Sequence, residues 1–202
     1  MHQQLKIASK FDLHVVKDFF DANTCREIVS EISSSPAAAS LTYGKGEGAV
    51  DDRIRRAMEV SPSPATVAYV NRRLEEARSE LAVHFRVALN GYEPPQFLCY
   101  RAGDFFVAHQ DGNTGMVNLE SDRTRRISIS IFLNSQSDEH QSGVYSGGSL
   151  LFSDWHTGVR QEVWGEAGTL LAFRSETTHE VAPVTHGKRY AIVSWFGQYG
   201  RQ

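Results

Sequence analysis

The second half of the chain, from Pro95 onward, restricts the fold more than any other feature of the sequence. Short runs rich in aromatic and β-branched residues alternate there with Gly, Asn, Asp and Ser, the pattern of short strands joined by turns. We expect eight strands, at residues 96–100, 105–109, 126–134, 149–152, 162–164, 169–173, 180–184 and 190–196. So many short strands after a helical segment predict an α+β protein with a mainly β core, a sandwich or jelly-roll braced by helices.

The first half of the chain is expected to be mostly helical. Thr24 and Glu27 have the T-x-x-E spacing of a capping box in front of a helical pattern. Ser63 can cap a longer helix and Pro64 suits its first turn, and apolar residues then recur every three or four positions as far as Phe85.

A single domain over residues 1–202 accounts for this organisation, since the length fits one sizeable core. We expect a helical support region over 1–94 and a jelly-roll core over 95–202. Residues 33–50 are rich in Ser, Ala and Gly without periodicity, so they are expected to be a loop.

The overall composition excludes several classes of protein. A net charge of -3 leaves no general footprint for nucleic acid. No apolar run approaches 18 residues and the N-terminal residues do not resemble a leader, so no membrane segment is expected. The two cysteines, Cys25 and Cys99, do not suggest a disulfide framework. These features predict a reduced, cytoplasmic protein.

Arginines form two short clusters. Their members are Arg53, Arg55, Arg56, Arg123, Arg125 and Arg126. Such clusters are usually solvated surface, although they could steer an anionic ligand toward a cleft.

Residues 126–131 alternate strictly, with serines on one side of the expected strand and isoleucines on the other. In a barrel that holds a ligand, the small polar face could line the pocket. The serines could equally face solvent, and the pattern alone does not choose.

One histidine and one aspartate project together from the end of an expected strand. His109 and Asp111 are two positions apart, which places both side chains on the same side. A lone pair of this kind arises by chance too readily to identify a site. His179, at the start of another strand-like run, is the best candidate for a third ligand. Two imidazoles and one carboxylate are the facial set that non-haem iron(II) oxygenases use, although zinc hydrolases can use similar ligands.

Arg189 narrows the choice of metal chemistry. It begins an apolar, buried-looking strand ten residues after His179, and a buried charge is costly unless it is paired. Its planar guanidinium suits a two-point contact with a carboxylate. A dicarboxylate that chelates iron at one end and meets this arginine at the other would satisfy both ends of the site.

The segment from Phe97 to Phe196 resembles the catalytic core of the 2-oxoglutarate- and iron(II)-dependent oxygenases of the prolyl 4-hydroxylase-like superfamily. The motifs that carry the resemblance are Tyr100-x-x-Gly103-x-x-Phe106-x-x-His109-x-Asp111, Arg126 to Asn134, Gly147 to Phe152, Gly168-x-Leu170-Leu171-x-Phe173, and His179 with Pro183, Gly187 and Arg189. The resemblance covers about half the chain. It implies a double-stranded β-helix, a cupin-like jelly-roll, and makes residues 1–202 a single oxygenase domain.

The resemblance implies a role for each residue that matches a motif. His109, Asp111 and His179 match the iron ligands, and Arg189 matches the basic residue that grips the distal carboxylate of 2-oxoglutarate. Three further residues match the co-substrate pocket, namely Tyr100, Ser128 and Trp195. Phe132 stands where some relatives have tyrosine, so one hydroxyl contact to 2-oxoglutarate is missing at that position.

The resemblance implies that the protein is a dioxygenase. Such an enzyme uses Fe(II), O2 and 2-oxoglutarate, with ascorbate as a further cofactor, and couples hydroxylation of a C–H bond to decarboxylation of 2-oxoglutarate to succinate. Asp111 favours hydroxylation over halogenation, because a small residue there would be needed to admit a halide. The expected substrate is a prolyl residue in a protein or peptide, with a free amino acid or another small molecule as the alternative. The loop 112–124 has the position of a substrate lid, or it is an ordinary surface loop.

Three rival functions stay open at this stage. Nucleic-acid demethylases share the triad but place a second arginine six residues after the first, where this chain has Trp195. A metal-dependent hydrolase or isomerase on a cupin-like barrel would not need Arg189. A non-enzymatic sensor could keep the triad and bind iron and 2-oxoglutarate without turnover.

Overall fold

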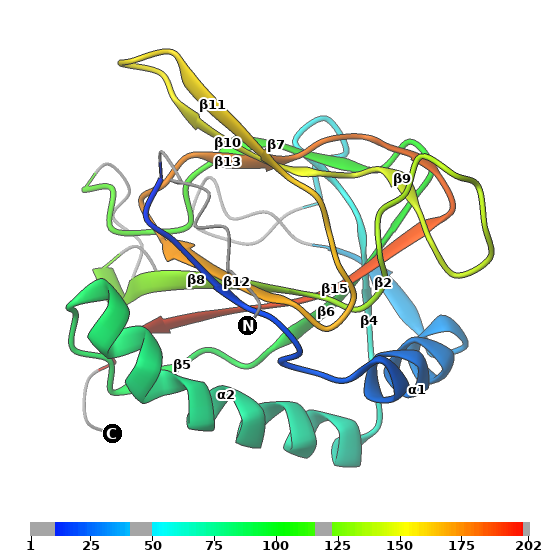
Figure 1. Cartoon of the computed structure of the whole chain (residues 1–202), viewed down its shortest axis with the longest axis horizontal. Helices are drawn as coiled ribbons and strands as arrows, with labels where there is room; N and C mark the ends of the chain where they lie inside the picture. The colour runs from blue at the N-terminus through cyan, green and yellow to red at the C-terminus, as the bar shows by residue number, and fades with distance from the viewer. Residues whose placement is uncertain (1–10, 41–49, 116–122, 200–202) are drawn as a thin grey trace, which may run out of the picture.

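The computed structural model describes residues 11–40, 50–115 and 123–199. Within them lie two helices and fifteen strands. Thirteen of the strands form two facing β-sheets with the helices on one side, and the other two strands pair only with each other (Figure 1). The helices are α1 (Ala22–Ser33) and α2 (Pro64–Phe85). The strands of the first half are β1 (Leu13–Val16), β2 (Ala37–Ala39), β3 (Arg55–Arg56), β4 (Met58–Val60) and β5 (Gly91–Tyr92). Those of the second half are β6 (Gln96–Arg101), β7 (Phe105–His109), β8 (Arg125–Phe132), β9 (Ser146–Gly147), β10 (Leu150–Asp154), β11 (Val159–Val163), β12 (Leu170–Arg174), β13 (His179–Val181), β14 (Val184–His186) and β15 (Lys188–Gly197).

The larger sheet, called here the major sheet, has the order β1-β12-β8-β15-β6-β4-β2, with β5 also paired to β15. Its strands are antiparallel, and the register of β15 places Trp195 opposite Ser128 and Arg189 opposite Tyr100. The long central strand β15 therefore places Arg189 and Trp195 next to Tyr100 and Ser128, which lie on the two strands that flank it.

The smaller sheet, called here the minor sheet, has the order β11-β10-β13-β7-β3. Here β13 pairs antiparallel with β7, and the register places His179 opposite His109. Two strands that are distant in the chain thus bring the two histidines together. The predicted strand 180–184 is divided in the structure into β13 and β14, because Pro183 lies between them and has no N–H for a sheet.

The helices begin and end at identifiable residues. Helix α1 is capped by Asp21, whose carboxylate accepts from the Thr24 N–H at 2.7 Å, so the expected capping box at Thr24 lies inside the helix and that prediction was wrong. Helix α2 begins as predicted, with Ser63 as its cap and Pro64 in its first turn. It ends at Phe85, and Arg86 adopts the left-handed conformation (φ 52°) that follows many helices.

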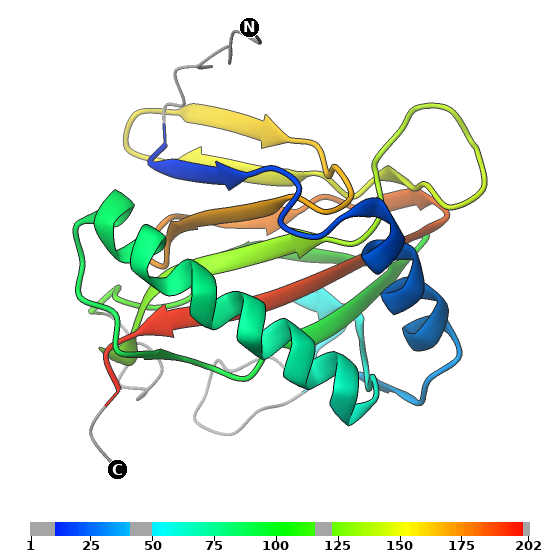
Figure 2. The same ribbon diagram turned by 60° about the horizontal axis from the view of Figure 1, so that its bottom comes forward.

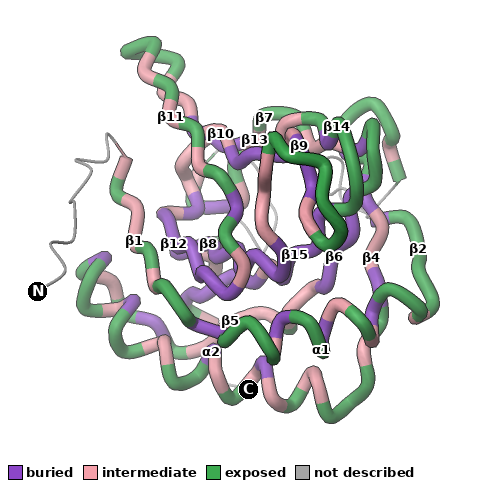
Figure 3. Tube along the Cα trace, turned by 45° about the vertical axis from the view of Figure 1, so that its right-hand side comes forward, coloured by how far each residue is buried: buried purple, intermediate pink, exposed green. Residues whose placement is uncertain are grey.

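Both helices cover the outer face of the major sheet, and Figure 2 shows α2 crossing the strands of that sheet. The apolar core on this side joins Val70, Leu74 and Leu81 of α2 to Ile127 and Ile129 of β8. The opposite face of the major sheet meets the minor sheet around a second apolar cluster, which includes Leu98, Phe152 and Phe173. Burial is accordingly concentrated in the central strands, while the surrounding loops are exposed (Figure 3).

The first half of the chain is less helical than expected. Strand β1 forms one edge of the major sheet, and β4 and β2 extend its other end. Residues 37–39, expected in a loop, pair with residues 58–60. Most of the loop proposed as a lid, 116–122, lies outside the described residues. Among the described residues, no helix combines the length and apolar character needed to span a membrane.

Candidate metal centre and anion pocket

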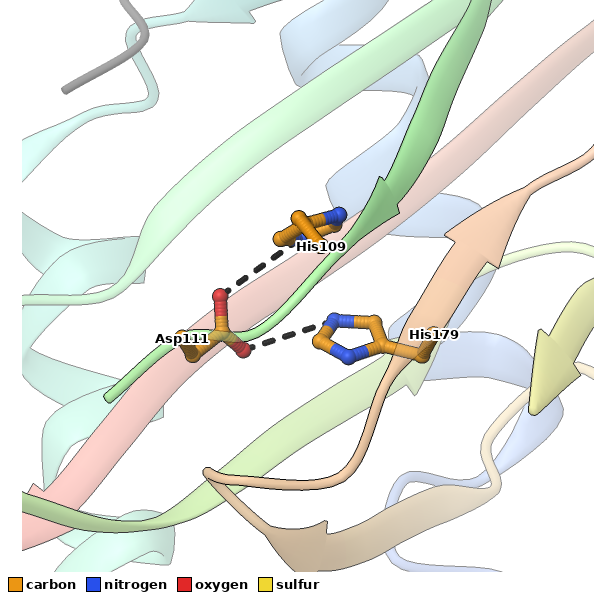
Figure 4. Close-up of side chains that lie close together, drawn as sticks. All are labelled: His109, Asp111 and His179. Carbon is orange, nitrogen blue, oxygen red and sulfur yellow. Dashed lines mark ion pairs between the residues drawn. The ribbon is translucent and has the colours of Figure 1, made fainter. Parts of the chain in front are cut away.

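Three side chains with metal-ligating atoms converge between β7 and β13 (Figure 4). His109 Nε2 lies 3.5 Å from Asp111 Oδ1, and His179 Nε2 lies 3.4 Å from Asp111 Oδ2. One ligand atom from each residue lies within 4.8 Å of the others. The cross-strand pairing of His109 with His179, and the position of Asp111 two residues beyond His109, bring together the three residues that the sequence analysis selected.

Backbone carbonyls determine which nitrogen of each imidazole faces the centre. His109 Nδ1 lies 2.8 Å from the Val107 carbonyl oxygen, and His179 Nδ1 lies 2.9 Å from that of Thr177. A carbonyl oxygen can only accept, so each Nδ1 carries the proton and donates. Both Nε2 atoms are then left with a free lone pair toward Asp111, as a metal ligand requires.

The titration of these groups also suits a metal site. Burial, followed by the neighbouring charge of His109, lowers the pKa of His179 to about 4, so this imidazole is neutral at neutral pH. Burial alone would raise the pKa of Asp111, but His179, His109 and Arg125 together hold it well below its usual range. His179 and Asp111 can therefore bind a cation at neutral pH without first losing protons.

The Asp111 backbone is held from two sides. Its N–H donates to the Ser175 carbonyl at 2.9 Å, and its own carbonyl accepts from Arg125 at 3.3 Å. Arg125 makes a two-point ion pair with Glu93, at 2.6 Å for each contact, and its guanidinium lies 3.7 Å from the Trp195 ring centroid. This network fixes the place where the chain leaves β7.

Arg189 lies on β15, in the opposite sheet, and is only 2% exposed. Its guanidinium carbon lies 5.2 Å from the Tyr100 ring centroid and 5.4 Å from that of Phe132. Its Nε has no hydrogen-bond partner within the described part of the chain. A buried donor without a partner is costly, so this arginine is suited to a ligand that brings an acceptor.

One cavity connects the histidine–aspartate cluster to Arg189. Residues from both sheets line it, including Tyr100, His109, Asp111, Ser130, His179, Arg189 and Trp195. Of the three residues predicted for the co-substrate pocket, Tyr100 and Trp195 face this cavity. Ser128 is buried beside it, and its hydroxyl donates to the Ser175 hydroxyl at 3.0 Å.

The structure shows which face of β8 the serines and the isoleucines occupy. The isoleucines pack toward α2, and Ser128 and Ser130 are buried on the interior side, so the alternative that they face solvent was wrong. Ser130 lines the cavity and its hydroxyl has no partner among the described residues. The sequence analysis placed it on a serine face that could line the pocket but did not include it among the co-substrate residues, although it shares that strand face with Ser128.

The arginine clusters are not uniformly surface. Arg55 is 8% exposed, lines the cavity and lies 4.8 Å from the Phe106 ring centroid, and that ring is stacked on His109 at 3.6 Å. Arg125 is also largely buried, in its ion pair with Glu93. Neither position is distinguishable in sequence from its exposed neighbours, because the cluster has no periodicity that separates a buried arginine from a solvated one.

The residues present fit iron(II) and a dicarboxylate. Two imidazoles and one carboxylate on one side of a cation leave its other side open, the donor set of non-haem iron(II) oxygenases. The buried Arg189 at the far end of the same cavity fits the second carboxylate of a short diacid.

Comparison with known proteins agrees with this fit. Residues 95–197, just over half of the chain, match the family model described as the 2OG-Fe(II) oxygenase superfamily. A PKHD-type hydroxylase of Stenotrophomonas maltophilia is 36% identical over 106 residues, which is 52% of this chain and 43% of that protein. A PKHD-type hydroxylase of Burkholderia thailandensis is 28% identical over 173 residues, 85% of this chain and 70% of that protein. The chain thus spans less than half the length of the Stenotrophomonas relative.

Solved structures share the fold over nearly the whole chain. A Pseudomonas putida prolyl-4-hydroxylase has a TM-score of 0.68 at 22% identity, with 95% of each chain covered. A prolyl hydroxylase of Trichoplax adhaerens, in complex with a peptide of a hypoxia inducible factor, has a TM-score of 0.69 at 18% identity, with 93% of this chain and 84% of that chain covered. These similarities confirm the jelly-roll core, and the family match, together with the converging triad, shows that the chain belongs to the 2OG-Fe(II) oxygenase superfamily.

Proposed function

We propose that this protein hydroxylates a C–H bond and couples the reaction to decarboxylation of 2-oxoglutarate to succinate. One observation carries the proposal. A histidine–aspartate–histidine cluster and a buried arginine lie at the two ends of a single cavity. A hydrolase or isomerase would need the cluster but would have no use for a buried cation beyond it.

In this proposal His109, Asp111 and His179 hold Fe(II), and Arg189 holds the distal carboxylate of 2-oxoglutarate. The iron would supply the activation of O2 and the oxidation of both substrates. Asp111 offsets one of the two metal charges, and the two Nδ1–H donors keep the imidazoles oriented. Arg189 sets the direction in which the co-substrate lies, so its other end is presented to the metal.

Aromatic rings form the walls of the cavity beside the metal cluster. Phe106 is stacked on His109, and Phe173 meets His179 edge-on at 4.6 Å. Trp195 lies above the guanidinium of Arg125, which in turn braces Asp111. An apolar lining of this kind strengthens the charge interactions inside it and protects reactive species from side reactions.

The proposed substrate is a prolyl residue in a protein or peptide. The support is the similarity in fold to a prolyl-4-hydroxylase and to a prolyl hydroxylase bound to a peptide. Incubating the protein with Fe(II), 2-oxoglutarate and a library of proline-containing peptides should yield products heavier by one oxygen atom, with one succinate formed for each. Succinate formed without any modified peptide across the library would contradict this choice of substrate.

A free amino acid or another small carboxylate is the second candidate. The position of Arg55 favours it, because this second arginine faces the cavity near the metal cluster and could meet the carboxylate of a small substrate. Free amino acids should then be hydroxylated faster than the same residues within peptides that are blocked at the C-terminus, and Arg55→Ala should remove that preference. Equal rates on blocked and free substrates would exclude it.

Two further predictions accompany the proposal. We propose that ascorbate sustains turnover, which is checked by comparing product formation over many cycles with and without it. We also propose a cytoplasmic location, which is checked by fractionating cells that express the natural protein. A sensor without enzymatic activity is the rival class, and succinate formation above the rate of the Asp111→Ala variant would exclude it.

A further inference from the structure

A second cavity lies next to the one that holds the metal cluster, where the chain passes from β3 of the minor sheet to β4 of the major sheet. Its volume is about 290 Å³. The charged residues that line it are three arginines and two aspartates, namely Arg55, Arg56, Arg101, Asp52 and Asp104. We call this cavity the arginine pocket. Its charged side chains leave one positive charge in excess.

Two of the arginines carry charges that the described part of the chain does not neutralise directly. Arg56 and Arg101 are exposed, and neither forms an ion pair with a carboxylate among the described residues. Arg56 lies over the Phe105 ring, with its guanidinium carbon 5.6 Å from the ring centroid. Asp104 meets Arg101 through the backbone, since its carboxylate accepts from the Arg101 N–H at 2.8 Å. Both guanidinium groups can therefore pair with an anion that enters the pocket.

Ser40 adds a buried hydroxyl to the same pocket. This residue is 2% exposed and lines the pocket, and its N–H donates to the Ala57 carbonyl at 2.9 Å. Its hydroxyl has no hydrogen-bond partner within the residues that the structure describes. A buried hydroxyl that has lost water without gaining a partner is costly. Beside several guanidinium groups, the acceptor that best completes it is an oxygen of an anion.

The lining of the arginine pocket selects the chemistry of its ligand. Guanidinium groups and a hydroxyl all donate hydrogen bonds, and a carboxylate or a phosphate group accepts several of them at once. A water molecule takes up roughly 30 Å³ in the liquid. The pocket therefore has room for a charged group together with part of the molecule that carries it.

Arg55 connects the arginine pocket to the metal cluster. It is 8% exposed and lines both cavities. Its guanidinium carbon lies 4.8 Å from the Phe106 ring centroid, and that ring is stacked on His109. One guanidinium and one aromatic ring thus lead from the arginine pocket to a metal ligand. A molecule whose charged group is held in the pocket can extend past Arg55 toward the metal.

We propose that the arginine pocket binds a carboxylate or phosphate group of the substrate, so that the enzyme acts on anionic substrates. The assignment to the substrate rests on the proposed function, whereas the binding of an anion in the pocket does not. The site differs from that of Arg189, which lines only the cavity of the metal cluster. It also gives a role to two arginines of the cluster at residues 53–56.

The first test measures anion binding without turnover. The protein is loaded with Mn(II) and saturated with 2-oxoglutarate, so that the metal cavity is filled, and is titrated by calorimetry with sulfate at constant ionic strength. We expect saturable binding at one site, about tenfold weaker in Arg101→Ala, the size typical of a hydrogen bond to a charged group. Absence of saturable binding to the wild type, or equal affinity in Arg101→Ala, would overturn the inference.

Two further variants separate a built site from a general effect of charge. Ser40→Ala should bind sulfate severalfold more weakly without a fall in melting temperature, because its hydroxyl has no described partner to lose. Arg53→Ala is the matched control, since the Arg53 side chain is 89% exposed, pairs with Asp51 at 3.0 Å and does not line the pocket. A loss in Arg53→Ala as large as that in Arg101→Ala would show a general charge effect and overturn the site.

The second test asks whether the anion belongs to the substrate. With Fe(II) and 2-oxoglutarate, both candidate substrate classes are offered in matched pairs that differ in one charged group. The pairs are peptides with glutamate or glutamine, or with phosphoserine or serine, within four residues of the proline, and free glutamate against glutamine. We expect a KM about tenfold lower for the anionic member of at least one pair, and loss of this preference in Arg101→Ala.

The outcomes of the two tests are distinguishable. Sulfate binding that depends on Arg101, without a preference for the anionic member of any pair, would assign the pocket to a free anion and overturn its role in substrate binding. If the protein neither binds nor consumes 2-oxoglutarate while sulfate still binds, the proposed function fails and the anion site stands.

Discussion

The two ends of the cavity are built from different sheets and differ in exposure. At the metal end, on the minor sheet, the side chains of His109 and Asp111 are 19% and 10% exposed. At the anion end, on the major sheet, Arg189 is 2% exposed. Solvent therefore reaches one end and is excluded from the other.

This difference indicates a division of labour. A centre at which three molecules must meet needs an opening, whereas a group that only holds a ligand in place works best where water cannot compete. At the metal end the Nε2 atoms of both histidines face the Asp111 carboxylate, an arrangement that a cation would complete, and the anion end contains buried donors without described partners. The affinities for metal and for 2-oxoglutarate should thus depend on charged side chains at both ends of the cavity. Changes in side-chain packing should have their main effect at the closed end.

The largest effect is expected at the open end. Asp111→Ala removes the carboxylate between the two imidazoles, so metal-dependent formation of succinate should be abolished, while the far-ultraviolet circular dichroism of the metal-free protein stays that of the wild type. Mn(II) should raise the melting temperature of the wild type but not that of the variant. Asp138→Ala, at an exposed aspartate, is the control and should retain both properties. Activity retained in Asp111→Ala would refute the assignment of the site.

At the closed end, Arg189→Ala should weaken 2-oxoglutarate binding by roughly 3–5 kcal/mol, because it leaves a carboxylate in a buried site without its cation. Binding of Mn(II) alone should be unchanged, since the ligands lie on the other sheet. Calorimetric titration of each ligand measures both. Lys188→Ala, which removes an exposed charge one residue away, should change neither, and an unchanged affinity in Arg189→Ala would move the co-substrate elsewhere.

The tight packing of the closed end is tested by Gly165→Ala. The added Cβ would meet the Tyr145 hydroxyl at 2.0 Å and Phe132 at 2.7 Å, so we expect a loss of about 1–3 kcal/mol in the free energy of unfolding. Chemical denaturation measures it. Gly91→Ala is the matched control, since its Cβ would meet only the Tyr199 side chain, at 3.2 Å. Similar stability of Gly165→Ala and wild type would show that the closed end has more room than the structure indicates.

The smallest effect separates two serines on one strand face. Ser130 lines the cavity without a described partner, so Ser130→Ala should lower 2-oxoglutarate affinity by less than about 1 kcal/mol and should not lower stability. Ser128 donates to Ser175, so Ser128→Ala should cost about 1 kcal/mol of stability and leave affinity unchanged. Calorimetry and chemical denaturation of both variants check this, and the reverse pattern would show that Ser128 is the one that faces the ligand.

Much of the β core could be predicted from sequence, because alternation and turn residues are local signals. Strand β7 has the predicted bounds, and the Ser63–Pro64 start of α2 follows from side-chain chemistry within four residues. The metal-binding residues could also be predicted from sequence. His109 and Asp111 are two positions apart in a strand, so their side chains point to the same side, and a buried Arg189 needs an anionic partner.

The features that were missed depend on contacts far apart in the chain. Strands β1 and β2 have only four and three residues and exist because they pair with β12 and β4. The cap of α1 is a different case, because Asp21 accepts from the Thr24 N–H three residues away, and aspartate is a preferred N-cap residue that the local sequence offered. Tyr145 precedes a two-residue strand, and its place against Arg189 comes from the fold alone.

The central claim is that one cavity holds iron at its open end and 2-oxoglutarate against Arg189 at its closed end. Anaerobic addition of Fe(II) and then 2-oxoglutarate to the metal-free protein, followed by visible absorption, tests it most directly. We predict a charge-transfer band that requires both additions, is absent in Asp111→Ala, and needs a much higher concentration of 2-oxoglutarate in Arg189→Ala. No band with the wild-type protein, or an undiminished band in Asp111→Ala, would contradict the account.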